Sequence, residues 1–353
     1  MKAKKNTITL FFVILLLPVF LAALFVIVVD PFFHYHAPLP GLPYVLSEER
    51  YQNDGIVKHF SYEALITGSS TTQNFKTSDV ERLFGLSCVK VPFAGGSFRE
   101  TGDITKTALK HNRDLKLVIR GLDMNRIDVD KDDMDYDDIP AYLYDQNPFN
   151  DYDYLFNEGV RDASLNCLKR WIRREGPTSF DEYSYWNDGK TFGREAVLST
   201  YERIPEGQYS VPELTEEDYR VIRENLQQNV IDPAEQYPDV TFCVFVPPAS
   251  VCVWDSIIRV GSLDRTIETL RYAYELLLDV ENIKVYGFDD CIDITGNLDN
   301  YMDTQHYSSA INTYMLECMA TGEKLLTKEN ITDYLEKVRS DYADYDYESI
   351  YEP

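Results

Sequence analysis

The sequence predicts an α/β fold of three layers, in which helices cover both faces of a parallel, flavodoxin-like sheet. Short, continuous apolar runs that alternate with segments of helical periodicity predict this architecture. At 353 residues and 44% hydrophobic content, the chain is long and apolar enough to build the core that such a fold needs. An uncharged N-terminal run predicts a transmembrane helix, and a long polar, aromatic stretch predicts a large insertion.

The first element is an uncharged apolar run from Ile8 to Val29, long enough to cross roughly 30 Å of hydrocarbon as a helix. It exceeds the apolar region of a cleaved secretory signal, so we predict an uncleaved signal-anchor over 8–29. Three lysines precede the run and Asp30 follows it. The positive-inside rule then leaves residues 1–7 as a cytoplasmic stub of a single-pass cell-membrane protein, and places the rest outside the cytoplasm.

The next segment, residues 30–59, begins with four prolines among aromatic residues and predicts an extended collar beside the membrane. It contains His34 and His36, a spacing that also occurs in metal ligand pairs. No cysteine or carboxylate cluster accompanies them, so we favour interfacial packing.

The main domain is expected over residues 60–325. Its expected strands are 62–67, 88–93, 115–122, 240–246 and 283–288, and its expected helices lie near 77–84, 99–111, 263–279 and 307–322. Residues 326–353 are expected to form a C-terminal helix and an acidic, aromatic tail that is either mobile or packed on the surface.

The insertion is expected at about 124–212 and is rich in Asp, Tyr, Asn and Trp. Ligands of open α/β sheets bind beyond the carboxyl ends of the strands, where such an insertion would form an aromatic lid. The alternative is that these aromatic side chains are only the insertion's own core. The sequence leaves both open.

The charge balance excludes nucleic acid as a partner. The part after the span has 31 Lys and Arg (34 less the three N-terminal lysines) against 59 Asp and Glu, a formal charge of about −28. A solvated acidic surface is favoured over one that attracts a cationic polymer.

Neither a metal nor a nucleotide cofactor is expected, because the chain has no clustered Cys/His ligands and no phosphate-binding glycine loop. The Asp-rich stretch 131–138 lacks the ligand spacing and glycine of a calcium loop. Six cysteines occur in the exported part, and their spacing predicts no disulfide pairing.

The first motif that carries chemistry is ALITGSSTTQNF, residues 64–75. An apolar strand runs directly into Gly68, Ser69 and Ser70, which would place a serine hydroxyl at the carboxyl edge of the sheet. Backbone N–H groups at the following helix start could stabilise an oxyanion there. The alternative is ordinary turn and helix-capping chemistry.

The second motif is MDTQHYSSAIN, residues 302–312, which follows the last expected strand. An aspartate three residues before a histidine can share one tight turn with it. Asp303 can then orient the imidazole of His306 and stabilise its charged form while the ring takes a proton from a serine.

At these two motifs the sequence resembles the SGNH, or GDSL, hydrolase superfamily. GSSTT stands where that family has its GDS block, so the matching serine is Ser70, and Ser69 takes the place of the family's aspartate. The family's last block is Asp-x-x-His, which matches Asp303 and His306. The resemblance implies a Ser70–His306–Asp303 triad.

Two further blocks of the family supply oxyanion donors. VPFAGGSFRE offers Gly95, and RGLDMNR matches the third block at Gly121. There, however, Asp123 falls near the position of the family's asparagine, and a carboxylate would repel an oxyanion. Either Asn125 substitutes, or the hole has fewer donors, or Asp123 serves another purpose. The candidate oxyanion residues that the resemblance implies are Ser70, Gly95 and, under the first of these alternatives, Asn125.

The GSS variant, the anchor and the divergent third block together resemble the membrane-anchored subgroup that includes the lipoteichoic acid D-alanylation and alginate acetylation proteins. The resemblance covers residues 60–125 and 240–322. It implies an extracytoplasmic acyl esterase or O-acyltransferase acting on a cell-surface polysaccharide or teichoic-acid-like polymer, with a membrane-bound O-acyltransferase as a partner. The alternative is a non-catalytic glycan-binding or scaffold protein of such a complex.

Overall fold

The computed structural model describes residues 2–134, 136, 140–145, 147–205, 207, 209 and 211–351. The chain forms two compact units. Unit 1 comprises Met1–Phe60 and Asp138–Ser179, and unit 2 comprises Ser61–Asp137 and Phe180–Pro353. The stretch in which we expected one insertion is thus divided, since residues up to 179 belong with the N-terminal segment and those from 180 onward with the sheet.

Unit 2 is built on a five-stranded sheet of order β2-β1-β3-β4-β5, in which all neighbouring strands are parallel. This confirms the predicted α/β class and the flavodoxin-like strand order. The strands are β1 (Ala64–Thr67), β2 (Cys88–Lys90), β3 (Leu117–Gly121), β4 (Thr241–Phe245) and β5 (Ile283–Tyr286). Each lies inside an expected apolar run, and their side chains are almost all buried because helices cover both faces.

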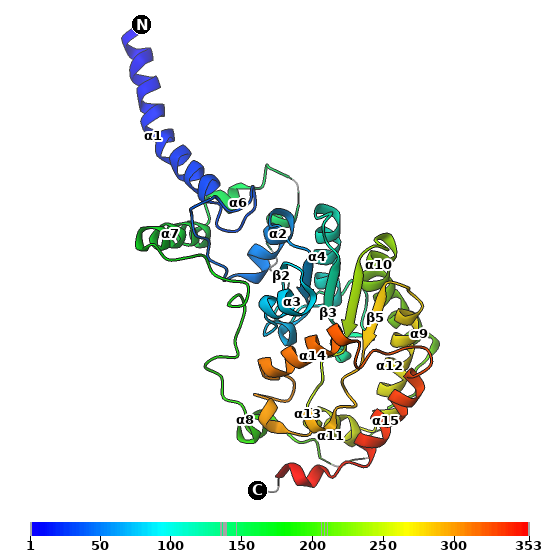
Figure 1. Ribbon diagram of the computed structural model, residues 1–353. Helices are drawn as coiled ribbons and strands as arrows, with labels where there is room; N and C mark the ends of the chain where they lie inside the picture. Colours follow the sequence, from blue (N-terminus) through cyan, green and yellow to red (C-terminus); the bar gives the residue numbers. More distant parts are fainter. Residues whose placement is uncertain are drawn as a thin grey trace. The chain divides into compact units, whose positions relative to one another are not determined.

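The helices of unit 2 form two groups (Figure 1). One group contains α3 (Thr77–Phe84) and α14 (Ser309–Thr321), which contact each other. The other contains α4 (Phe98–His111), α9 (Glu216–Leu226), η3 (Gln227–Ile231), α10 (Asp232–Gln236) and α12 (Leu263–Leu278), which form a continuous series of contacts. Because parallel crossovers are right-handed, the reversal of strand order after β2 sends the two groups to opposite faces.

Local signals explain where several of these helices begin and end. Ser97 caps α4 by accepting the N–H of Glu100, and Thr215 forms a capping box with Asp218 at the start of α9. Gly85 ends α3 with a φ of 69°, a conformation that glycine adopts without strain. The remaining short elements of unit 2 are η1 (Ser70–Thr72), η2 (Met124–Arg126), α8 (Arg194–Thr200), α11 (Val251–Arg259), α13 (Ile292–Thr295) and η4 (Leu298–Asn300).

The C-terminal segment forms α15 (Ile331–Ala343) and η5 (Tyr347–Tyr351). Tyr342 is fully buried and stacks on Trp254 of α11, with ring centroids 4.0 Å apart and an interplanar angle of 5°. Ile350 is also buried. Of the two alternatives for the acidic tail, its described part is therefore packed against unit 2, because aromatic side chains bury a large apolar area.

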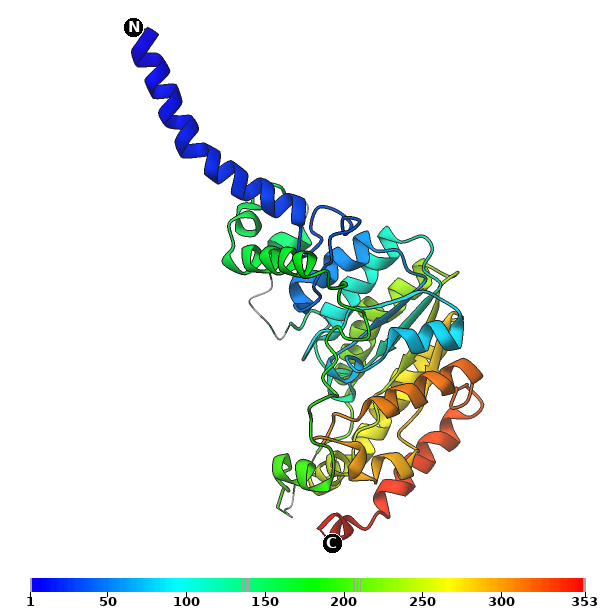
Figure 2. The same ribbon diagram turned by 60° about the vertical axis from the view of Figure 1, so that its left-hand side comes forward.

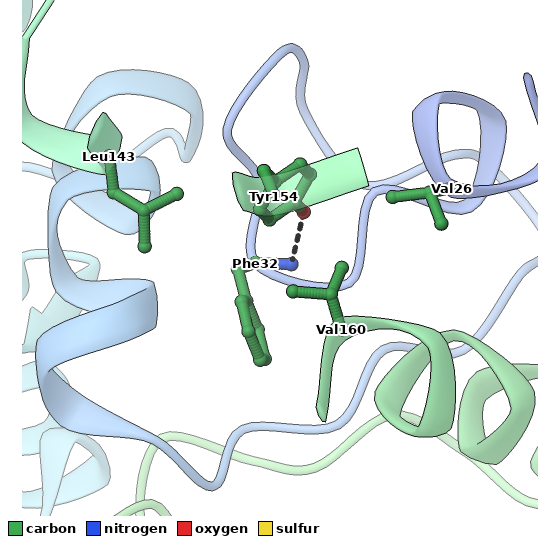
Figure 3. Packing of buried hydrophobic residues seen from close by; sticks show 5 residues of the cluster. All are labelled: Val26, Phe32, Leu143, Tyr154 and Val160. Carbon is green, nitrogen blue, oxygen red and sulfur yellow. Dashed lines mark hydrogen bonds between the residues drawn. The ribbon is translucent and has the colours of Figure 1, made fainter. Parts of the chain in front are cut away.

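Unit 1 contains α1 (Lys2–Val29), α2 (Glu49–His59), α5 (Ala141–Tyr144), α6 (Tyr152–Leu155) and α7 (Glu158–Arg173). Its core includes Val26, Phe32, Leu143, Tyr154 and Val160 (Figure 3). The apolar part of α1, Thr9–Val29, has a mean hydropathy of 3.3 and only 6% of it is buried. One N-terminal helix is thus long and apolar enough to span a membrane.

Candidate active site

The loop after β1 presents Ser70 at the carboxyl edge of the sheet. Gly68 has a φ of +151°, and Ser69 caps η1, so the chain turns sharply between the strand and Ser70. The Thr72 hydroxyl donates to the carbonyl of Ser69 at 2.7 Å and holds this turn closed. Strand order reverses between β1 and β3, which is the switch point where open α/β sheets bind their ligands.

Asp303 and His306 share a tight turn between η4 and α14. One carboxylate oxygen of Asp303 accepts the backbone N–H groups of Gln305 and His306, each at 2.8 Å. The other oxygen lies 2.7 Å from Nδ1 of the His306 ring. Burial alone would raise the pKa of Asp303, but these hydrogen bonds to the charged form outweigh it and the net pKa is lowered. Asp303 therefore remains a carboxylate at neutral pH.

The structure brings Ser70 together with this turn, although 236 residues separate Ser70 from His306. Ser70 Oγ lies 2.8 Å from His306 Nε2. The side chains of His306 and Asp303 are each about one-quarter exposed, so the site is open to solvent at one side. In this arrangement the His306 imidazole can remove the proton of the Ser70 hydroxyl. The Asp303 carboxylate can stabilise the imidazolium that results.

Trp186 is a residue of this site that the sequence analysis did not single out. Its indole N–H donates to the Ser70 carbonyl at 3.4 Å, and its ring packs edge-on to the His306 ring at 5.5 Å. The buried side chain of Asn74 holds the Trp186 loop by accepting the N–H groups of Trp186 and Asn187, both at 3.1 Å. The 180–212 part of the expected insertion thus contributes an aromatic wall to the candidate site, a position that no motif spacing signals.

Asp123 accepts a hydrogen bond from Ser69, the residue before Ser70. The Ser69 hydroxyl donates to Asp123 Oδ1 at 2.8 Å, and the Thr71 hydroxyl lies 3.5 Å from the same oxygen. Burial raises the pKa of Asp123, although Ser69, Arg126 and His306 act in the opposite direction. Of the three alternatives for the divergent third block, these contacts support a separate purpose for Asp123: it anchors the turn that presents Ser70.

The two other expected oxyanion residues lie in loops at the same edge. Gly95 follows β2 with a φ of 63°, and its carbonyl accepts a hydrogen bond from Arg126 at 3.4 Å. Asn125 is exposed and lines a cavity of about 60 Å³ with Thr71, Asp123 and Gln305, the residue before His306. Gly95 is not among the residues that line this cavity.

A cavity of about 340 Å³ in unit 1 is lined by residues such as Val45, Tyr51 and Asn166 and holds none of these groups. We place the candidate chemistry at Ser70 because the hydrogen-bonded geometry, rather than cavity size, defines a nucleophile.

Within the described part of the chain, no group of three or more His, Cys, Asp or Glu side chains could hold a metal ion. Asp135, Asp137 and Asp138 of the Asp-rich stretch lie outside the described residues. His34 contacts Asp151 at 3.4 Å, whereas His36 contacts the backbone carbonyls of Ala37 and Ile27. All six cysteines carry free thiols: Cys88, Cys167, Cys243, Cys252, Cys291 and Cys318.

No protein-family model matches the chain. No curated protein matches it significantly either. One solved structure, described as a candidate platelet activating factor from Streptococcus pneumonia, is similar with 12% sequence identity and a TM-score of 0.36, over 81% of this chain and 91% of that chain. A likeness at this level carries no argument about function.

A close approach between β3 and η1 supplies a test of how Ser70 is positioned. A Cβ on Gly121 would lie 2.8 Å from the Thr72 methyl group and 3.4 Å from the Phe245 ring, all in the buried core. We expect Gly121→Ala to lower the free energy of unfolding by about 1–3 kcal/mol through overpacking. The displaced η1 should also slow the reaction of Ser70 with a serine-directed probe. Urea unfolding and the labelling rate measure the two effects.

The matched control is Gly176→Ala, because a Cβ there would meet nothing within 4 Å. Wild-type stability and labelling in both glycine variants would contradict the view that the Gly121–Thr72 contact positions Ser70.

Proposed function

We propose that the chain is an SGNH-type serine esterase or O-acyltransferase. The single observation that carries the proposal is the continuous hydrogen-bonded series of Ser70 Oγ, the His306 imidazole and the Asp303 carboxylate, with separations of 2.8 and 2.7 Å. These are the distances at which a histidine can take the proton of a serine hydroxyl. The fold places the serine at the switch point of the sheet, which agrees with this role.

In the proposed reaction, His306 Nε2 accepts the Ser70 proton as Oγ forms a bond to the carbonyl carbon of an acyl ester. The backbone N–H groups of Ser70 and Gly95, with Asn125 in place of the family's asparagine, are the candidates to hold the resulting oxyanion. The tetrahedral intermediate then collapses, the ester C–O bond breaks, and the leaving alcohol takes the proton from His306. An acyl-Ser70 intermediate remains.

Water or an acceptor hydroxyl then attacks the acyl-serine, with His306 again taking and returning the proton. Water as the acceptor gives an esterase, and a sugar or polyol hydroxyl gives a transferase. Throughout, the charge of Asp303 balances the imidazolium and keeps Nδ1 of His306 protonated.

The site of action that we propose is the outer side of the cell membrane. The support is the exposed apolar length of α1 together with three lysines before it and Asp30 after it. We further propose a cell-surface polysaccharide or teichoic-acid-like polymer as substrate and a membrane-bound O-acyltransferase as partner. Both follow from the resemblance stated above and from the apolar helix that would anchor the chain in a membrane.

A non-catalytic glycan-binding or scaffold role is the second candidate, and one observation favours it. Asp123 presents a carboxylate near the position where an oxyanion donor is expected, and its charge opposes the charge that builds up on an oxyanion. A binding protein forms no oxyanion, so the Asp123 carboxylate would not impair its function.

Labelling of the full-length chain in detergent with a fluorophosphonate probe distinguishes the two. We expect wild type to react and both Ser70→Ala and His306→Ala to lose the label, because the probe reports an activated serine. Ser199→Ala and His111→Ala, at exposed positions away from Ser70, are the matched controls and should label as wild type does. A folded wild type that does not react would favour the scaffold.

A further inference from the structure

One face of unit 1 exposes apolar side chains that no other described element covers. On α7, Leu165, Leu168 and Ile172 recur at helical spacing. Trp171 is 56% exposed and Ile172 is 72% exposed. Leu165 and Ile172 lie on one side of this helix, and Trp171 lies on the side of Cys167 at its C-terminal end. Large apolar residues that are this exposed mark an interaction surface.

The segment that precedes α7 exposes further aromatic side chains. Phe149 is 89% exposed, and Tyr152 and Phe156 are also exposed. Asp151 ties this segment to the loop after α1, since its carboxylate accepts the Tyr35 hydroxyl at 3.0 Å and contacts His34. The exposed aromatic residues thus belong to the part of unit 1 in which the apolar helix α1 ends.

The position of α7 relative to α1 is set by a shared core. Val26 of α1, Tyr154 of α6 and Val160 of α7 belong to one buried cluster (Figure 3). The Tyr154 hydroxyl donates to Asp30 at 2.7 Å and accepts the N–H of Phe32 at 3.2 Å, just after α1. As Figures 1 and 2 show, α7 crosses near the end of α1 instead of running along it. A helix held in this way would lie beside the surface of a bilayer that α1 crosses.

The charge of this helix is opposite to that of the chain. Residues 165–174 contain four basic residues and no acidic one, whereas the whole chain carries −25. The segment before α7, residues 145–157, contains three aspartates and no basic residue. Glu175 lies 3.8 Å from both Arg170 and Arg173. Lys169, Arg173 and Arg174 are exposed. Long basic side chains can keep their charged ends at a headgroup layer while their methylene stems cover apolar surface. A basic helix with exposed Trp and Ile is the composition of an interfacial helix.

We propose that the C-terminal half of α7 rests on an anionic phospholipid surface, with Trp171, Ile172 and Leu165 in the interfacial layer. The proposal depends on α1 crossing the membrane and is independent of the chemistry at Ser70. Lipid is favoured over a protein partner because α1 ends in the same packed cluster as α7 and because the local charge complements anionic headgroups. Contact through both α1 and α7 would fix the orientation of unit 1 on the bilayer, whereas α1 alone would leave unit 1 free to rotate.

Tryptophan fluorescence of the full-length chain in vesicles of phosphatidylcholine and phosphatidylglycerol tests this surface. The chain has three tryptophans, and Trp254 is fully buried. With phosphatidylcholine brominated near the headgroup, we expect quenching of wild type and loss of most of that quenching in Trp171→Phe. Trp186→Phe, which removes a tryptophan of unit 2, is the matched control and should retain it.

A second variant tests the charge. Lys169→Glu combined with Arg173→Glu should reduce the quenching, and the reduction should be largest when phosphatidylglycerol is present. Equal quenching of wild type and Trp171→Phe would overturn the proposal and leave the face for a protein in the membrane. Failure of the chain to float with the vesicles would also overturn it, because α1 would then not be inserted.

Discussion

Replacement of Asp303 by asparagine is expected to lower kcat/KM for a short acyl ester by roughly ten-thousandfold while leaving the fold intact. The asparagine carbonyl can still accept the backbone N–H groups of Gln305 and His306, so the turn is retained. Its amide nitrogen cannot accept a hydrogen from Nδ1 of His306, however. The imidazole would then take the other tautomer, with a proton on Nε2, and could not accept the proton of Ser70.

Asp130→Asn is the matched control for this prediction. Asp130 also accepts a backbone N–H two residues later, from Asp132 at 2.8 Å, but it lies in an exposed loop without a histidine. We expect Asp130→Asn to keep wild-type turnover. Comparable turnover by Asp303→Asn and wild type, with the unfolding midpoint unchanged, would show that Asp303 does not orient the base.

The second large effect is expected at Asp289, which follows β5 and is only 2% exposed. Burial, with a smaller contribution from the neighbouring charge of Asp290, raises the pKa of Asp289 to about 7. Its Oδ2 atom has no hydrogen-bond partner among the described residues. An ionised Asp289 is therefore costly in the folded chain.

The sign of the effect of pH on stability follows from the pKa of Asp289 in the folded and in the unfolded chain. The unfolded carboxyl has its ordinary pKa of about 4, so between about pH 4 and pH 7 the folded chain holds a proton that the unfolded chain has released. The stability that this proton supplies is fully present below pH 4 and is lost as pH rises toward 7. The loss corresponds to about 4 kcal/mol in the free energy of unfolding.

Asp289→Asn removes this titration, because the amide has nearly the same shape and stays neutral. We expect the variant to have a higher urea midpoint than wild type at pH 8, and about one-third of that excess at pH 5, since the loss begins near pH 4. The exposed Asp239→Asn is the control and should follow wild type at both values. If the difference between Asp289→Asn and wild type does not grow with pH, Asp289 is not buried as a neutral acid.

The strands were predictable because their signal is local. A strand that is buried on both faces must be a short continuous apolar run, and each of the five observed strands lies inside a run expected from the sequence. The helices α2, α7 and α11 were not expected individually. Their apolar residues cover only one narrow face, which is a weaker signal in segments rich in aromatic and polar residues.

The candidate site was predictable in its chemistry and less so in its surroundings. Ser70 and the Asp303–His306 turn are marked by short local patterns, whereas Trp186 reaches them only through the contacts of its loop with Asn74. The pairing of Ser69 with Asp123 likewise joins residues that follow two different strands. Neither relation has a fixed spacing in the chain.

By itself, the sequence determined the apolar N-terminal helix, the parallel α/β class and the residue types able to carry nucleophilic chemistry, because each depends on neighbours within a few residues. Only the tertiary structure decided that Ser70 Oγ and His306 Nε2 lie 2.8 Å apart, that residues 138–179 fold with the N-terminal segment, and that α7 packs at the end of α1. The first of these results depends on how a parallel sheet aligns the ends of distant strands. The other two depend on which apolar faces bury one another. A local sequence pattern encodes neither of these causes.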